Sequence, residues 1–405
     1  MCVDGVKPPS ASAVVGATLA AQTVISMAAL TLPVIAPTLA QVLGVDASTI
    51  GYQVSIVYAG AMASAAAGGE IVARVGACRT TQLALALVSA AMLLAMVPRL
   101  PALVAASILL GLGYGASNPA GAHLLTRFTP ASSRNLIFSL KQTGVPLGGM
   151  AAALVAPIMT HALGWRAALG IVTVLATVML TLLLPVRHHW DNDRHARMSK
   201  KEFPTAPSGR RGMLGGIGFV WARRNLRYLS LMALCFAGVQ LCLMTFAVTF
   251  LVKEAHYTLV EAGVLLSMVQ LAGAAGRIGW GWIADQLHAS RPTLVVLGGL
   301  MFFATLAMTQ INEQWSATLT TVIFMAMGVT AIGWNGVFLA EVARLAPAGE
   351  TSTATGGALF FTFSGVLIGP SFFTAVYSHL ESYAGTFAMA AAFVVAGLIF
   401  LAKAK

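Results

Sequence analysis

Twelve apolar runs, each long enough to cross a lipid bilayer, constrain this chain more than any other feature of its sequence. The hydrocarbon core of a bilayer is about 30 Å thick, which takes about 20 apolar residues per helix. Only 9% of the 405 residues are charged, against roughly 25% in an average globular protein. The sequence therefore predicts an all-α, multi-pass membrane protein and excludes a soluble enzyme, a disordered chain and a disulfide-rich secreted domain. We expect the membrane helices at 13–40, 50–72, 80–98, 101–122, 136–161, 167–186, 228–252, 260–284, 293–310, 316–340, 353–378 and 382–402.

The positive charge of the chain predicts its orientation. Ten of the 24 Lys and Arg residues lie between Arg187 and Arg227, between two apolar runs. Basic residues accumulate in cytoplasmic loops, so we expect both termini in the cytosol and the protein in a bacterial-type inner membrane. With this orientation 19 Lys and Arg face the cytosol and 3 face outward. We thus interpret the net charge of +11 as a consequence of membrane topology. The basic residues are also expected to contact anionic lipid, and no nucleic-acid partner is expected.

The second half of the chain repeats features of the first. Two sets of residues recur at constant offsets: Gly51, Ser55, Gly69 and Arg79 match Gly263, Ser267, Gly281 and Arg291 at 212, while Gly144, Val145, Gly148 and Gly164 match Gly365, Val366, Gly369 and Gly385 at 221. Equal halves with the same topology predict two six-helix bundles related by a pseudo-twofold axis normal to the membrane. We expect an N-terminal bundle at 1–186, a basic cytoplasmic central loop at 187–227 and a C-terminal bundle at 228–405.

The stretch from Gly281 to Arg291 reads Gly-Trp-Ile-Ala-Asp-Gln-Leu-His-Ala-Ser-Arg. With twelve spans and a basic central loop, it resembles the major facilitator superfamily of secondary transporters across the whole chain. The resemblance implies a transporter that is not an enzyme, alternates access between two sides and needs no cofactor. The family's short loop signature, roughly Gly-x-Leu-Ala-Asp-Arg-x-Gly-Arg, lacks its aspartate in the first half, where Gly69, Arg74, Gly76 and Arg79 remain.

Asp285 keeps the signature's acid in the second half. An acid at a helix end beside basic loop residues can form a charge-assisted latch between the bundles, and the alternative is a solvated aspartate. The predicted gating residues are Asp285, Gly281, Arg291, Gly69, Arg74, Gly76 and Arg79.

Two cations, Lys141 and Arg277, fall inside predicted membrane helices, whereas the acids lie in loops or at helix ends, with Glu70 the nearest to an interior position. A charge in the membrane costs several kcal/mol unless it faces a partner or a wet cavity. At 1.5 Å per residue, Lys141 lies ~9 Å and Arg277 ~12 Å from the cytosolic helix ends. Both approach the midplane, where such transporters bind substrate; the alternative is snorkelling to the interface.

Arg277 and Asp285, spaced by Gly281, form a pattern similar to that of monocarboxylate and other anion transporters of the superfamily. The resemblance implies that Arg277 holds a carboxylate, which a planar guanidinium matches with two parallel hydrogen bonds. Lys141 is expected to matter mainly for dianions. The predicted substrate-binding residues are Arg277, Lys141, Tyr58, Asn335, Gln142, Gln270 and Thr362, with Gln22, Asn118, Gln240 and Trp334 as further polar candidates.

The sequence thus predicts a monomeric secondary transporter that imports a small organic anion with protons and holds no metal. The first alternative is an exporter of drugs or metabolites that works by proton antiport. Many family antiporters carry an arginine where this chain has Ser107, and a cationic drug would need an acid in the cavity. A second alternative is a membrane sensor that does not transport.

Overall fold

The computed structural model describes residues 10–45, 47–193, 215–311 and 315–404. Every regular element in these ranges is a helix or a short helical turn. The elements of the first half are α1 (Ala11–Val34), α2 (Ala36–Leu43), α3 (Ala47–Ala66), α4 (Gly68–Val75), α5 (Ala77–Ala95), α6 (Leu100–Phe128), η1 (Ala131–Ser133), α7 (Arg134–Gln142), α8 (Gly144–Leu163), α9 (Trp165–Leu182) and α10 (Arg187–Trp190).

The second half follows the same plan. Its elements are α12 (Gly215–Ala222), α13 (Arg224–Glu254), α14 (Leu259–Gln286), α15 (Ser290–Met308), α16 (Ala317–Met327), the π-helical turn η2 (Gly328–Ile332), α17 (Asn335–Leu345), α18 (Thr351–Leu380) and α19 (Tyr383–Lys403). Within the described chain, eleven helices or helix groups are long and apolar enough to cross a membrane, and the α3–α4 pair, bent by 58°, makes a twelfth. The predicted all-α fold with twelve spans is confirmed.

The described parts of the predicted central loop at 187–227 are largely helical. Residues 194–214 of it lie outside the described residues. The remainder forms α10, α12 and the first turn of α13, and α12 packs against α18 and α3. The apolar sequence of α12, Gly-Gly-Ile-Gly-Phe-Val-Trp-Ala, explains why it packs against membrane helices instead of extending into water.

Close contacts between small residues set the spacing of the helices. At Gly111 and Gly115 of α6, an added Cβ would lie 2.2 and 2.1 Å from the backbone oxygens of Val57 and Ala61 on α3. Small residues let membrane helices approach this closely. The glycines of α6 therefore fix the contact between two helices that both line the cavity described below.

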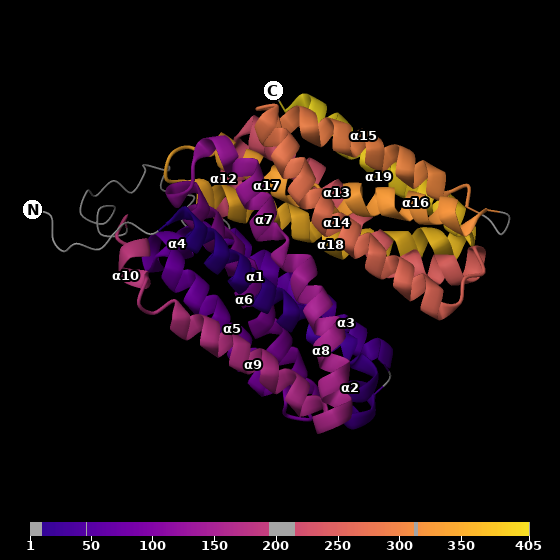
Figure 1. Ribbon diagram of the computed structural model, residues 1–405, viewed down its shortest axis with the longest axis horizontal. Helices are drawn as coiled ribbons and strands as arrows, with labels where there is room; N and C mark the ends of the chain where they lie inside the picture. The colour runs from indigo at the N-terminus through magenta and orange to yellow at the C-terminus, as the bar shows by residue number, and fades with distance from the viewer. Residues whose placement is uncertain (1–9, 46, 194–214, 312–314, 405) are drawn as a thin grey trace, which may run out of the picture.

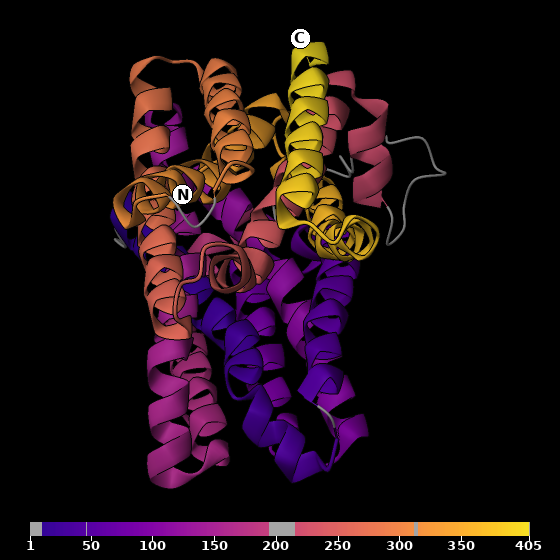
Figure 2. The ribbon, with the colours of Figure 1, turned by 90° about the vertical axis from the view of Figure 1, so that its right-hand side faces the viewer.

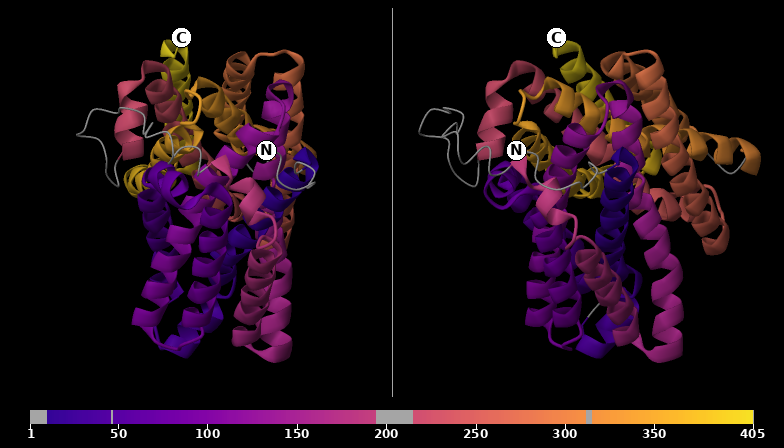
Figure 3. Two further views of the ribbon diagram at one scale, coloured as in Figure 1. Left: turned by 90° about the vertical axis from the view of Figure 1, so that its left-hand side faces the viewer. Right: turned by 60° about the vertical axis from the view of Figure 1, so that its left-hand side comes forward.

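The helices gather into two sets, one from each half of the chain (Figure 1). Figures 2 and 3 show the two sets one above the other, with α7 reaching up alongside the second set. They meet where α7 packs against α14 and α17, and where α18 packs against α3, α4 and α6. We call the end of the molecule where α1 begins and α19 ends the terminal side, and the opposite end the far side. The sets lie close together on the terminal side and diverge toward α2 and α16 (Figure 1).

Candidate functional site

A cavity of about 80 Å³ lies between the two halves. Helices of both halves line it, and its polar and aromatic side chains are Tyr58, Tyr114, Asn118, Gln142, Gln240, Arg277, Asn335, Thr362 and Phe363. Most of the predicted substrate-binding residues thus lie together at one place. Gln270 does not: it is half-buried on α14 and is not part of this lining.

Arg277 ties the two halves together at this cavity. Its side chain is 2% exposed, and Nε donates to the backbone oxygen of Ile332 at 2.9 Å. Nη1 donates to the backbone oxygen of Gln142, in the other half. Both partners are neutral carbonyls, and no carboxylate pairs with Arg277 among the described residues. A buried cation with only neutral partners is costly, so the site favours an anion from outside the protein.

Local helix distortions supply both carbonyls. Gln142 ends α7, and the residue four positions later is Pro146, which has no N–H to donate to the Gln142 oxygen. Ile332 ends the π-helical turn η2, which interrupts the span between α16 and α17. The same turn offers the oxygen of Val329 to Trp280 Nε1 at 3.1 Å. Such π-helical interruptions are frequent at functional sites.

Lys141 is equally buried, at 3% exposed, but its surroundings differ. Nζ donates to Gln22 Oε1 at 2.6 Å, to Asn118 Oδ1 and to Gln142 Oε1 at 3.2 Å. The ammonium does not line the cavity, although Asn118 and Gln142 do. Three amide oxygens thus take its three donors in this structure.

Three aromatic rings cluster on the cavity wall. The ring centroids of Tyr58 and Tyr114 are 6.1 Å apart, and Phe363 lies 5.8 Å from Tyr58 and 6.0 Å from Tyr114. Rings at these separations and tilts attract one another edge to face. Tyr58 is on the predicted list; Tyr114 and Phe363 were not predicted, because apolar membrane helices contain many aromatic residues that face lipid or core.

Polar side chains of the second half form a fixed group beside the rings. Gln240 Oε1 accepts from Asn335 Nδ2 at 3.0 Å and from Trp334 Nε1 at 3.2 Å. Thr362 lines the cavity while its hydroxyl donates to Ala358 of its own helix. Asn335 and Gln240 thus hold each other in place on the lining.

Asp285 makes a contact between the halves, as the latch hypothesis expects, but its partners are not basic residues. Its carboxylate accepts from the backbone N–H of Asn135 at 3.0 Å and of Leu136 at 2.8 Å, and from Asn135 Nδ2 at 2.9 Å. These amides begin α7, where the helix dipole favours a negative charge. Gly281 completes the contact, because an added Cβ would lie 2.5 Å from Ser139 Oγ.

The signature of the first half contacts α18 without an acid. An added Cβ at Gly69 would lie 2.3 Å from Thr353 Oγ1. Arg74 pairs with Glu70 of its own helix and is exposed. In the second half, Arg291 donates to the oxygens of Leu401 and Ala402 at the end of α19 and does not reach the first half in the described structure.

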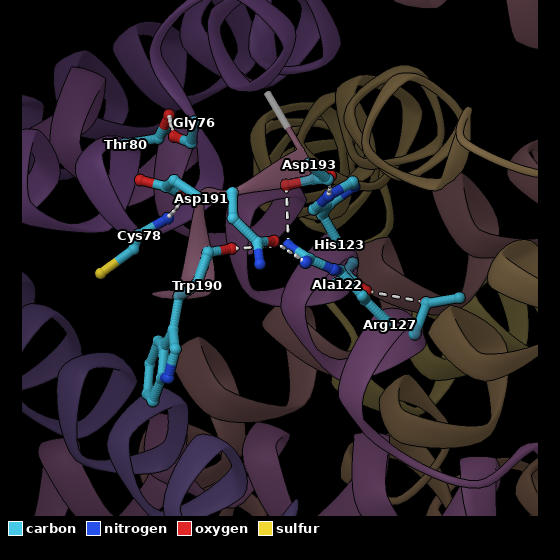
Figure 4. A network of polar contacts seen from close by, with 11 residues as sticks. Gly76, Cys78, Thr80, Ala122, His123, Arg127, Trp190, Asp191 and Asp193 are labelled. Carbon is cyan, nitrogen blue, oxygen red and sulfur yellow. Dashed lines mark hydrogen bonds and ion pairs between the residues drawn. The ribbon is translucent and has the colours of Figure 1, made fainter. Parts of the chain in front are cut away.

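The acid that the first signature lacks is supplied by a later segment (Figure 4). Asp191, which follows α10, accepts from the backbone N–H of Cys78 at 2.8 Å and of Arg79 at 3.0 Å. Gly76 makes room for it, since an added Cβ there would lie 2.5 Å from the Asp191 carboxyl carbon. Asp191 therefore caps α5 within the first half, whereas Asp285 caps α7 across the two halves.

One acid lies deeper than the sequence indicated. Glu341 is 2% exposed within α17 and pairs with Arg344 Nη2 at 2.5 Å. Glu341 lies near the end of its helix but is buried, because this span continues to Leu345 whereas the predicted run stopped at 340. Its charge is already paired, and it does not line the cavity.

Known proteins resemble this chain along most of its length. The family model described as Major Facilitator Superfamily matches residues 17–370. An uncharacterized MFS-type transporter of Mycobacterium tuberculosis is 28% identical over 58% of this chain and 50% of its own length. The benzoate transport protein of Acinetobacter baylyi is 23% identical over 65% of this chain and 60% of its own, and a gallate transporter of Pseudomonas putida is 25% identical over 66% and 64%. The chain thus spans between about half and two thirds of the length of these relatives.

Solved structures agree on the fold. The fucose:proton symporter of E. coli superposes with a TM-score of 0.74 at 12% identity, over 98% of this chain and all of that one. A human organic anion transporter gives 0.73 at 14% identity, over 97% of this chain. At such identities the likeness concerns the fold alone. The match of the family model over most of the chain, together with this fold, places the protein in the Major Facilitator Superfamily of membrane transporters.

Proposed function

We propose that this protein is a secondary active transporter that takes up a small organic anion, a carboxylate, together with protons. The single observation that carries the proposal is Arg277, a buried cation on the cavity wall whose partners are backbone carbonyls. A guanidinium offers a planar fork that matches a carboxylate. In a site shielded from water this pairing is stronger than on a surface.

The cluster of Tyr58, Tyr114 and Phe363 supports a substrate with an aromatic ring. All three side chains line the same cavity as Arg277. An aromatic carboxylate would place its charge on the guanidinium and its ring among these rings, with Asn335 and Gln240 in reach of ring hydroxyls. The names of two relatives, a benzoate transport protein and a gallate transporter, fit this chemistry.

The remaining lining supports an anion over a cationic drug. The part of the lining that the structure describes holds Arg277 and no Asp or Glu. A cation would lack a counter-charge there and would meet the guanidinium. This observation counts against the exporter of cationic drugs.

Transport would proceed by rocking the bundles 1–186 and 228–405 about the cavity. In this proposal the contacts of Asp285 with α7 and of Gly69 with α18 keep the terminal side closed. Opening that side requires both contacts to separate. We propose that the terminal side is cytosolic in an inner membrane and that the monomer is the working unit.

The experiment that tests the substrate class is a thermal-shift screen of the purified full chain. The probes are benzoate, cyclohexanecarboxylate, benzamide, tetraphenylphosphonium and a hexose. A ligand that binds only the folded protein raises the melting temperature as its concentration exceeds Kd. We expect benzoate to stabilise most and cyclohexanecarboxylate less, because the latter keeps the charge and loses the aromatic ring. Stabilisation by tetraphenylphosphonium alone would contradict the proposal.

The orientation has its own test. Leu163 on the far side is 73% exposed and Leu287 on the terminal side is 66% exposed. In a background without the native cysteines, a membrane-impermeant maleimide should label Leu163→Cys in intact cells and not Leu287→Cys. The reverse pattern would overturn the orientation.

A further inference from the structure

Lys141 is a buried cation that does not line the cavity. Its three hydrogen-bond partners are carboxamide oxygens, from Gln22 of α1, Asn118 of α6 and its neighbour Gln142. An ammonium has three N–H donors, and a neutral amine has two. The three oxygens match the three donors of the protonated form, whereas the neutral amine would leave one of them without a donor.

Gln142 connects this cation to Arg277. Its side-chain oxygen accepts from Lys141 at 3.2 Å, a longer contact than the 2.6 Å to Gln22. Its backbone oxygen accepts from Arg277 Nη1. The Gln142 side chain also lines the cavity. One residue thus contacts both buried cations and the space where an anion would sit.

No described carboxylate neutralises this pair of cations. The titratable and charged side chains on α7 and on the elements packed against it are Arg134 on α7, Glu261, Arg277 and Asp285 on α14, Tyr114, His123 and Arg127 on α6, His161 on α8, and Glu341 and Arg344 on α17. The described helix α1 contributes none. The three acids and His123 are engaged elsewhere: Glu261 with Thr258, Asp285 with the start of α7, Glu341 with Arg344, and His123 with Asp193.

Two like charges close together in a dry site disfavour each other. An anion on Arg277 would cancel one of them and so favour a proton on Lys141. By linkage the effect is reciprocal: protonated Lys141 would favour the anion by the same factor.

We propose that Lys141 is the proton-binding group that couples proton movement to anion transport. This inference rests on the proposed function, since it needs an anion at Arg277. In each cycle Lys141 Nζ takes one proton from water on the side from which the anion enters. After the anion leaves Arg277 on the other side, Nζ gives that proton to water there and returns as a neutral amine. Asn118 and Gln142, which contact both Nζ and the cavity, mark the route between Nζ and water.

The test measures proton uptake during binding of benzoate to the purified full chain, by a pH dye in weakly buffered solution. Wild-type protein should take up protons as it binds, and its affinity should change with pH by up to about tenfold per pH unit for one linked proton. Lys141→Gln, which keeps a neutral polar side chain, and Lys141→Arg, which keeps a charge that cannot be lost, should bind benzoate without proton uptake and with an affinity independent of pH. In vesicles both variants should exchange benzoate but not accumulate it when a proton gradient is applied.

The outcomes separate the two proposals. Proton uptake that persists in either folded variant overturns the role of Lys141, as does wild-type binding without proton uptake; both leave the anion proposal standing. Complete loss of binding in both folded variants would make Lys141 an anion ligand and also overturns its role as a proton carrier. If wild-type protein binds no carboxylate at all, the proposed function fails and this inference with it. If Lys141→Gln does not fold, Lys141→Arg alone decides.

Discussion

Arg277 and Lys141 are the two buried cations at the centre of the protein, and they differ in what surrounds them. Their exposed fractions, 2% and 3%, are almost the same. Arg277 lies on the cavity wall and contacts two backbone carbonyls, one from each half. Lys141 lies behind the wall, with its donors taken by three carboxamides.

The comparison shows that the role of a buried charge depends on its hydrogen-bond partners and not on how far it is buried. A guanidinium with five donors and two neutral acceptors keeps donors for a ligand. An ammonium with three acceptors keeps none while it is protonated. We therefore assign the anion to Arg277 and the proton to Lys141.

The largest expected effect separates these two assignments. Arg277→Gln should weaken benzoate binding roughly 10- to 150-fold, because a hydrogen bond to a charged group is worth about 1.5–3 kcal/mol. Lys141→Gln should weaken it much less, since its ammonium does not line the cavity. Isothermal titration of both folded variants checks this, and equal losses would remove the distinction between the cations.

Arg277→Lys sharpens the comparison by keeping the charge and removing the fork. An ammonium is a point donor that cannot match both oxygens of a carboxylate in one plane. We expect an affinity about tenfold below wild type, as a loss of about 1.4 kcal/mol implies. Full recovery of wild-type affinity in this titration would show that charge alone suffices.

A substitution at Pro146 tests the contact between Arg277 and the backbone oxygen of Gln142. Pro146→Ala restores an N–H that can bond the Gln142 oxygen within the helix and so compete with Arg277. Benzoate affinity should fall about fivefold, the worth of one ordinary hydrogen bond of about 1 kcal/mol. Pro157→Ala is the matched control, since Pro157 lies in the same helix and is exposed. Equal affinities in the two variants would show that the Gln142 contact does not position Arg277.

The smallest effect on binding is expected at Asp285, far from either cation. Asp285→Asn weakens the cap on α7 between the halves, so transport should slow while benzoate affinity in titrations stays near wild type. Asp191→Asn is the control, because that cap lies within one half. Transport in Asp191→Asn should be near normal, and equal slowing in both variants would remove Asp285 as a contact that gates alternation.

The control variant Asp191→Asn also tests how pH affects the stability of the protein. Burial raises the pKa of Asp191 above its ordinary value, against the opposing effect of the two backbone N–H groups. The ionised form is thus disfavoured in the folded state, and the stability from this group falls as pH rises through the raised pKa. Asp191→Asn should lack that part of the pH dependence in melting curves.

The spans, the two buried cations and Asp285 could be predicted from the sequence, because length, hydropathy and a charge in an apolar run are visible residue by residue. Features that depend on three-dimensional packing could not be predicted. Tyr114 and Phe363 are ordinary aromatic residues until α6 and α18 bring them beside Tyr58. Gln270 was expected in the site, and only the cavity lining shows that it lies outside.

Of two other features, one had a sequence signal that periodicity alone does not reveal, and the other had none. Pro146 stands four residues after Gln142, which marks that carbonyl as lacking its helical donor. Asp191 replaces the acid missing from the first signature, but it comes 112 positions after Arg79, whose N–H it accepts. A contact at that separation follows from the return of the chain after α9 and cannot be derived from a local motif.

The most direct test of the account is a cycle that removes the ligand's charge and the protein's charge separately. Benzoate and benzamide share a ring and differ in the carboxylate, and Kd is measured for each with wild-type protein, Arg277→Gln and Lys141→Gln. We expect wild type and Lys141→Gln to prefer benzoate by roughly tenfold or more, as a charge-assisted bond implies, and Arg277→Gln to show almost no preference. The same preference in Arg277→Gln as in wild type would contradict the assignment of the anion to Arg277.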